Sequence, residues 1–137
     1  MASFSIFEHT ADIGIEAYGA TLEKAFENAA KGMFYIITDG SNIDAIERRE
    51  IKIPVDLDEE QLLVDWLSNL LYINDVEGLV FGDFEVKIGN ELAGEAWGEK
   101  YDRNKHGYGV EIKAVTYHLL QIKRNKKGFY IKVLFDI

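Results

Sequence analysis

The sequence predicts an α+β fold, a single domain over residues 1–137 in which two helices pack on a largely antiparallel or mixed β-sheet. Two segments carry apolar residues with the spacing of amphipathic helices. The other apolar segments are short, alternate with polar residues and are separated by turn signals, which is typical of hairpin strands. Runs of strands with only two intervening helices favour this class over a doubly wound α/β fold, which needs more helices of crossover length.

Eight segments have the character of strands. They are residues 4–8, 13–18, 46–57, 79–88, 91–98, 109–116, 117–123 and 129–135. Pro54 cannot donate a hydrogen bond to a neighbouring strand, so it indicates an edge strand or the end of a strand. Turn signals at Gly89-Asn90 and at 126–128 predict hairpins between the strands that flank them.

Each helix begins at a residue suited to capping. Thr21 is a good N-cap for the first helix, which ends before the polar residues 39–42. Asp58, followed by Gln61 three positions later, resembles a capping box for the second. The predicted buried faces are Leu22, Ala25, Phe26, Ala29, Met33 and Ile36 in the first helix and Leu63, Trp66, Leu67, Leu70 and Leu71 in the second.

The composition limits which binding partners and which cell compartment we expect for this protein. The net charge of −9 disfavours binding of nucleic acid through phosphate contacts and suits a basic protein or a cation. The absence of cysteine excludes disulfides, a thiolate nucleophile and a cysteine-type zinc site. No apolar run approaches the ~20 residues that span a bilayer, and the first five residues lack a secretory pattern. We therefore expect a cytoplasmic protein without membrane contact.

Three places carry residues capable of chemistry, and each has an ordinary alternative. Glu8 to Asp12 can supply cation ligands or an acid–base pair, or can form a turn in which Asp12 accepts backbone N–H bonds. Asp136 and the main-chain carboxylate of Ile137 are hard oxygen donors suited to Ca²⁺ or Mg²⁺. Alternatively, these residues form an exposed end that binds no ligand. The patterns alone favour the ordinary alternatives.

The third candidate site is the strand-like segment that runs from Lys113 to His118. A lysine on the core side of a strand would be unusual and would indicate function. The alternative, which the pattern favours, is that Lys113 points to water and His118 is a half-buried histidine with its hydrogen bonds satisfied.

Four segments together resemble the archease family. They are Glu8-His9-Thr10-Ala11-Asp12-Ile13-Gly14, Leu63-Val64-Asp65-Trp66-Leu67-Ser68-Asn69-Leu70-Leu71, Glu111-Ile112-Lys113-Ala114-Val115-Thr116-Tyr117-His118 and Phe135-Asp136-Ile137. They occur in the family's order and cover essentially the whole chain. One His-Thr-Ala-Asp segment would be a weak signal, whereas four in order are specific.

The resemblance implies a non-enzymatic helper of the GTP-dependent tRNA-splicing RNA ligase, one that promotes guanylylation of the ligase and its multiple turnover. It implies a divalent cation, calcium, bound by Asp12, Asp136 and Ile137, and a role for Lys113 together with Asp12 in ligase activation. His9 and His118 also match family residues and are expected to support the site. An RNA methyltransferase is a second partner class that the resemblance leaves open.

Two other function classes remain open. A metal-dependent hydrolase could hold Mg²⁺ in the same acidic cluster and activate water. A passive module that binds a small ligand is the third. Incubation with GTP and RNA in the absence of a ligase separates a helper, which does nothing, from an enzyme.

Overall fold

The structure, a computed structural model, describes residues 3–9, 11–55 and 58–137. The elements follow in the order β1 (Phe4–His9), β2 (Asp12–Gly19), α1 (Leu22–Thr38), β3 (Glu47–Pro54), α2 (Glu59–Glu77), β4 (Leu79–Ile88), β5 (Glu91–Lys100), β6 (Ala114–Asn125) and β7 (Gly128–Asp136). The predicted α+β class with two helices is confirmed.

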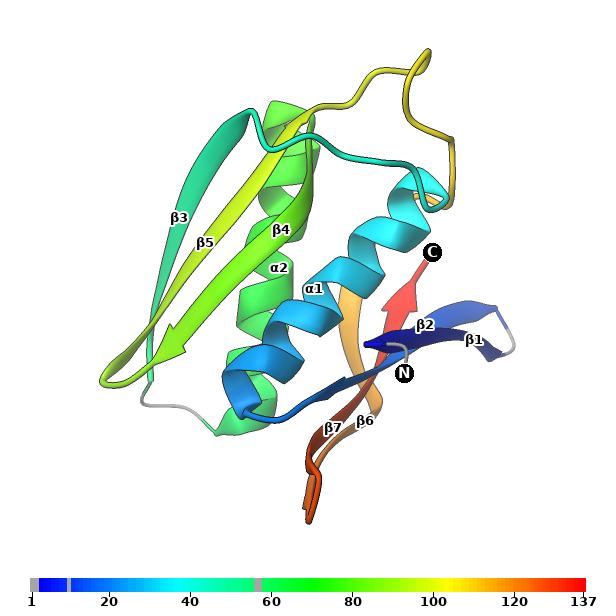
Figure 1. Ribbon diagram of the computed structural model, residues 1–137. Coiled ribbons are helices and arrows are strands. Elements are labelled where there is room, and N and C mark those ends of the chain that lie inside the picture. The colour runs from blue at the N-terminus through cyan, green and yellow to red at the C-terminus, as the bar shows by residue number, and fades with distance from the viewer. Residues whose placement is uncertain (1–2, 10, 56–57) are drawn as a thin grey trace.

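The strands form two sheets, although the sequence predicted one. The larger sheet has the order β1-β2-β7-β6 and the smaller has the order β3-β5-β4, and all five pairings are antiparallel. Both helices contact strands of both sheets, and α1 packs on β2 of one and β4 of the other (Figure 1). The helices therefore share one core with two sheets.

The predicted caps and apolar faces of the helices are confirmed. Thr21 accepts a hydrogen bond from the backbone N–H of Lys24 at 3.1 Å, and Asp58 accepts one from Gln61 at 2.7 Å. The side chain of Gln61 turns to Asp65 at 3.1 Å, so only half of the capping box forms. The predicted faces are buried, with Leu22 partly so, and the buried Trp66 donates its indole N–H to the carbonyl of Phe26 at 3.1 Å. This bond links the two helices.

Pro54 ends β3, an edge strand of the smaller sheet, as its chemistry predicts. Residues 56–57, which belonged to the predicted strand 46–57, lie outside the described residues. Within the described ranges, no helix is long and apolar enough to cross a bilayer.

The predicted strand over 109–116 is wrong for its first five residues. Gly109 and Val110 donate their backbone N–H groups to the carbonyls of Ile37 and Ile36, both at 3.1 Å. The last carbonyls of a helix have no partner within the helix, and here the passing chain satisfies two of them. A Cβ on Gly109 would lie 1.9 Å from the Ile36 carbonyl oxygen, so only glycine permits this approach. Residues 109–110 therefore run along the end of α1 rather than within a sheet, and β6 begins only at Ala114.

Candidate functional site

The ends of β1 and β7 and the starts of β2 and β6 meet along one edge of the larger sheet, the edge that runs across the strands. Ile13 of β2 pairs with Phe135 of β7, and the next step of this register brings Asp12 opposite Asp136. Asp12 also pairs with His9 across the β1–β2 hairpin. Because side chains alternate along a strand and Phe135 is fully buried, Asp136 lies on the face of the sheet away from the core. The two predicted carboxylate ligands thus occupy neighbouring positions on one face.

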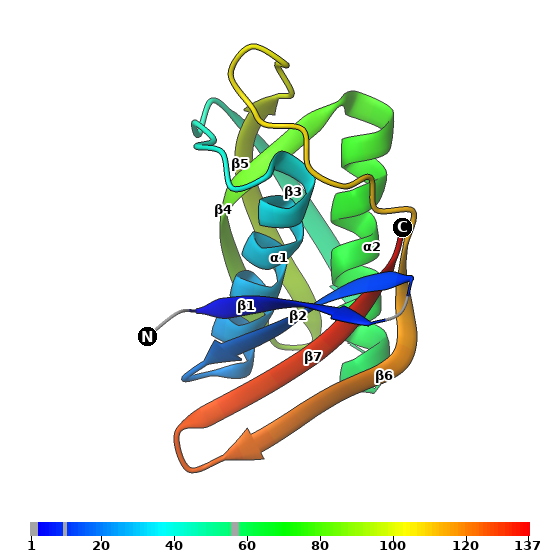
Figure 2. The ribbon, with the colours of Figure 1, turned by 90° about the vertical axis from the view of Figure 1, so that its right-hand side faces the viewer.

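β6 joins the same edge. Its first residue, Ala114, pairs with Asp136, and the backbone N–H of Lys113 donates to the Asp136 carbonyl at 2.7 Å. Figure 2 shows the C-terminal end of β7 beside the start of β6 and the β1–β2 hairpin. Lys113 itself is exposed, which confirms the solvent-facing alternative for its side chain. It lines a hollow of about 220 Å³ together with Tyr72 and Asp75 of α2.

The two histidines of the resemblance face one another. The rings of His9 and His118 lie 5.6 Å apart between centroids, at an interplanar angle of 58°. His118 is exposed, so the expectation of a half-buried, satisfied histidine is wrong. Nδ1 of His9 is buried, and the described residues offer it no hydrogen-bond partner. Thr10, between His9 and Asp12 in the motif, lies outside the described residues.

An irregularity in β6 brings His118 to this position. Thr116 pairs with Leu134 and Gln121 with Lys132, so four residues of β6 stand opposite one residue of β7. Leu119, inside this bulge, has φ 57°, a left-handed conformation that a residue with a Cβ rarely adopts. Residues 114–116 and the predicted strand 117–123 are therefore parts of one bulged strand, β6. Bulges of this kind redirect side chains near functional sites.

Two side chains at this edge are of the ligand type that a hard cation takes. Asp12 and Asp136 offer carboxylate oxygens, which Ca²⁺ and Mg²⁺ prefer. Within the part of the chain that is described, no three histidine, aspartate or glutamate side chains are grouped to hold a metal. A third protein ligand would thus come from a main-chain group, as the expectation for Ile137 requires, and water would complete the shell.

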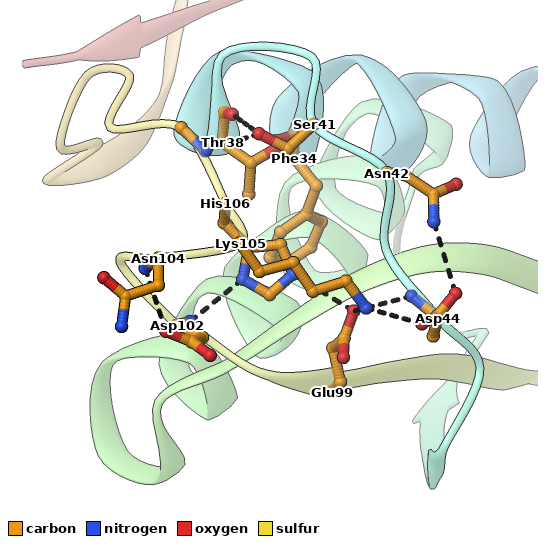
Figure 3. A network of polar contacts seen from close by, with 11 residues as sticks. Phe34, Thr38, Ser41, Asn42, Asp44, Glu99, Asp102, Asn104, Lys105 and His106 are labelled. Carbon is orange, nitrogen blue, oxygen red and sulfur yellow. Dashed lines mark hydrogen bonds and ion pairs between the residues drawn. The ribbon is translucent and has the colours of Figure 1, made fainter.

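A second polar cluster, which no sequence spacing indicated, anchors the segment that leads to Lys113 (Figure 3). His106 is buried, and its Nδ1 accepts the backbone N–H of Asp102 at 2.9 Å. The hydrogen is therefore assigned to Nε2, which donates to Glu99 at 3.1 Å. Lys105 pairs with the same Glu99 oxygen at 2.7 Å.

Glu99 holds a charge inside this cluster. Burial by itself would raise the pKa of Glu99, but the backbone N–H of Asp44 at 2.7 Å, Lys105 and His106 outweigh it and lower the pKa to about 2. Lys105 also contacts Asp44, and its pKa is raised chiefly by that bond and by its bond to Glu99. The partners are up to 61 residues apart in sequence, so no local pattern could reveal them.

Comparison with known proteins agrees with the sequence resemblance. The model of the archease protein family (MTH1598/TM1083) matches residues 4–137. Protein archease of Sulfurisphaera tokodaii is 48% identical, covering 96% of this chain and 95% of its own, and that of Pyrococcus furiosus is 46% identical, covering 98% and 97%.

Solved structures share the fold. The solution structure of protein 1598 of Methanobacterium thermoautotrophicum has a TM-score of 0.86 at 40% identity and covers both chains completely. The crystal structure of a Thermotoga maritima archease, described as a possible chaperone, has a TM-score of 0.66 at 29% identity and covers 96% of this chain and 94% of its own. The chain belongs to the archease protein family.

Proposed function

We propose that this archease is a non-enzymatic activator of the GTP-dependent tRNA-splicing RNA ligase, which promotes guanylylation of the ligase and its multiple turnover. The observation that carries the proposal is the convergence of Asp12, Asp136 and Lys113 at one edge of the larger sheet. These residues come from three separate segments of the sequence. The two aspartates lie on the outer face and Lys113 lies beside α2, so the three positions share one end of the sheet. This proximity supports one functional region rather than three unrelated features.

The chemistry of this edge suits an activator. An exposed lysine is available to a partner or to a phosphate that the partner holds. The net charge of −9 favours docking on a ligase that presents basic surface to RNA. It also disfavours competition by this protein for the RNA itself.

Asp12, Asp136 and Ile137 are the proposed ligands of a divalent cation, calcium. Two carboxylates at adjacent positions of one register repel one another. A bound cation would supply the positive charge that balances them. The ligands would hold the start of β2 against the end of β7, and thereby fix the edge from which Lys113 projects.

Multiple-turnover ligation tests the proposal. Limiting ligase is incubated with GTP and excess RNA ends, with and without this protein, and the ligated product is counted per ligase. The ligase is already charged with guanylate at the start of both reactions. We expect many turnovers per ligase with this protein and about one turnover per ligase without it. Equal product in both reactions would refute the activator role.

Omission of the ligase from the same reaction separates activator from enzyme. We expect neither ligation nor hydrolysis of GTP or RNA by the isolated protein. Turnover that persists through purification, and that is lost in Asp12→Asn, would instead support the hydrolase alternative.

A further inference from the structure

The outer face of α2 carries large apolar side chains that are open to solvent. Tyr72 is 66% exposed and Val76 is 63% exposed. They lie four residues apart, so they share one face of the helix, and the exposed Asp75 lies on the same face. Exposed apolar side chains that lie together and are bordered by polar groups mark sites of contact with another protein.

β6 extends this apolar face. The strand packs against α2 and runs beside it in Figure 2. Val115 lines a hollow of about 220 Å³ together with Tyr72 and Asp75. Tyr117 is 52% exposed, and its pKa is raised by partial desolvation and then by the carboxylate of Asp65, so it lies beside the first half of α2. These side chains form one apolar strip over the outer face of α2 and its seam with β6: Tyr72, Val76, Val115 and Tyr117.

A second hollow, of about 290 Å³, continues the seam past the end of α2. It is lined by Asn74 and Gly78 and by Tyr108 and Val110 of the segment that leads to β6. Sites for small molecules have volumes of about 300–1,000 Å³, and both hollows are smaller. They suit individual side chains of a bound protein better than a separate small ligand.

The charge around the strip is acidic. Among the described residues, no cation lies within ion-pair distance of the α2 carboxylates other than Glu77, which pairs with Arg49 at 2.7 Å. The helix contains no lysine or arginine, and its carboxylates are Glu59, Glu60, Asp65, Asp75 and Glu77.

Asp75 is the carboxylate whose position fits a structural role least. It lies near the end of α2, where the last carbonyl groups carry partial negative charge and disfavour an acidic side chain. Lys100 donates to the carbonyl of Glu77 at 2.6 Å, but no cation pairs with Asp75 itself among the described residues. A cation brought by a partner would balance this charge.

We infer that the apolar strip docks a basic segment of the RNA ligase, with an arginine against Tyr72 and Asp75. The inference rests on the proposed function, which names the ligase, and adds the surface that holds it. A guanidinium can stack on a tyrosine ring and form two parallel bonds with a carboxylate. An ammonium group lacks this planar fork. A ligase that presents basic surface to RNA is complementary in charge to this face of α2.

Other occupants fit these observations less well. RNA or an anionic membrane would meet the unpaired carboxylates of α2 and would be repelled. A second copy of this chain would bring a further net charge of −9 to the same face. Lys113 lines the same hollow as Tyr72 and Asp75, so a ligase segment docked here also lies next to the proposed activating lysine.

Calorimetric titration of the purified ligase with this protein tests the inference. We expect Tyr72→Ala and Asp75→Asn each to weaken binding about tenfold or more, as truncation of a central contact residue does. Binding of the parent protein should weaken as salt rises, and Asp75→Asn should reduce this dependence on salt. Asp75→Asn should melt no lower than the parent protein, because it loses no ion pair and removes a charge from the end of the helix.

Tyr35→Ala, at an exposed tyrosine of α1, and Asp83→Asn, at an exposed aspartate of β4, are the matched controls. Both residues line a different hollow and should bind the ligase like the parent protein when changed. Thermal melts verify that each variant is folded. At saturating concentration Tyr72→Ala should stimulate guanylylation of the ligase fully, whereas Lys113→Ala should not, since only the former is a docking residue.

Photo-crosslinking identifies the occupant. Tyr72 is replaced by benzoylphenylalanine, and the protein is irradiated with the ligase and a single-stranded RNA decamer present together. The product should be a cross-link to a ligase peptide that contains arginine, and the same replacement of Tyr35 should give none.

Two kinds of failure can be told apart. Unchanged affinity in both strip variants, or a cross-link from position 72 to the RNA or to a second copy of this chain alone, would overturn the inference and leave the activator role standing. Failure of the parent protein to bind the ligase would overturn both. Binding that depends on Tyr72 and Asp75 but gives no stimulation would refute the activator role alone.

Discussion

The backbone N–H of Lys113 donates a hydrogen bond to the carbonyl oxygen of Asp136 at 2.7 Å. This bond ties the residue before β6 to the last residue of β7, and it places the proposed activating lysine next to a proposed cation ligand. The side chains of the two residues remain exposed. One can therefore be altered without removing the contact that holds the other, and their roles can be measured separately.

The first prediction is that calcium stabilises the protein through Asp12 and Asp136. A cation that binds only the folded state at a hundredfold excess over its Kd adds about 2.7 kcal/mol to the free energy of unfolding. Thermal melts in calcium and in chelator should therefore differ for the parent protein. They should coincide for Asp12→Asn and for Asp136→Asn, because each variant lacks a charged ligand.

Asp83→Asn is the control for this measurement, since Asp83 is an exposed carboxylate on β4 of the smaller sheet. It should retain the full calcium effect. Coincident melts of the parent protein at millimolar calcium and in chelator would contradict a stabilising cation at this edge.

The second prediction concerns Lys113. Lys113→Ala should abolish stimulation of ligase guanylylation and of turnover after the first round, and should leave a single round by charged ligase unchanged. The side chain is exposed and makes no ion pair among the described residues, so the free energy of unfolding should change by about 0.5 kcal/mol or less. Lys52→Ala, an exposed lysine of β3, should stimulate normally. Full stimulation by folded Lys113→Ala would remove the lysine from the mechanism.

The third prediction is a pH dependence that originates at Glu99. Its pKa falls from an ordinary 4.5 to about 2 on folding, so its contribution to stability is present above pH 4.5 and is lost as pH falls towards 2. Glu99→Gln should lower the free energy of unfolding by about 1–3 kcal/mol near neutral pH, since charge-assisted bonds to buried groups are lost. Denaturant unfolding should show the deficit shrinking between pH 4.5 and 2.

Glu91→Gln, at an exposed carboxylate of β5, should show no comparable deficit. A deficit in Glu99→Gln that is the same at pH 2 and pH 6 would mean that packing, rather than charge, accounts for it.

The fourth prediction is that Leu119→Gly does not destabilise the protein. The left-handed conformation costs a residue with a Cβ about 1–2 kcal/mol, while the greater unfolded entropy of glycine costs about 0.5–1 kcal/mol. The free energy of unfolding in denaturant should stay the same or rise by up to about 1.5 kcal/mol. Leu120→Gly, next to it but packed against the core, should lower the free energy of unfolding. A loss for Leu119→Gly as large as that for Leu120→Gly would show that the bulge is held by the leucine side chain.

The sequence by itself determined the local features of this protein. The helices, their N-caps at Thr21 and Asp58, and the buried face that includes Trp66 follow from side-chain chemistry within a few residues. The edge position of Pro54 follows from its missing N–H. Family membership was also evident, because four segments carry the resemblance in order.

Tertiary structure alone decided which hydrogen bonds form between segments that are far apart in the sequence. The carbonyls of Ile36 and Ile37 take the N–H groups of residues 109–110, which removes that segment from the sheet that its alternating pattern predicted. The division into two sheets, the bulge at Leu119 and the cluster around Glu99 arise in the same way. Each depends on partners far apart in the chain, and apolar periodicity encodes only which face of an element is buried, not what covers it.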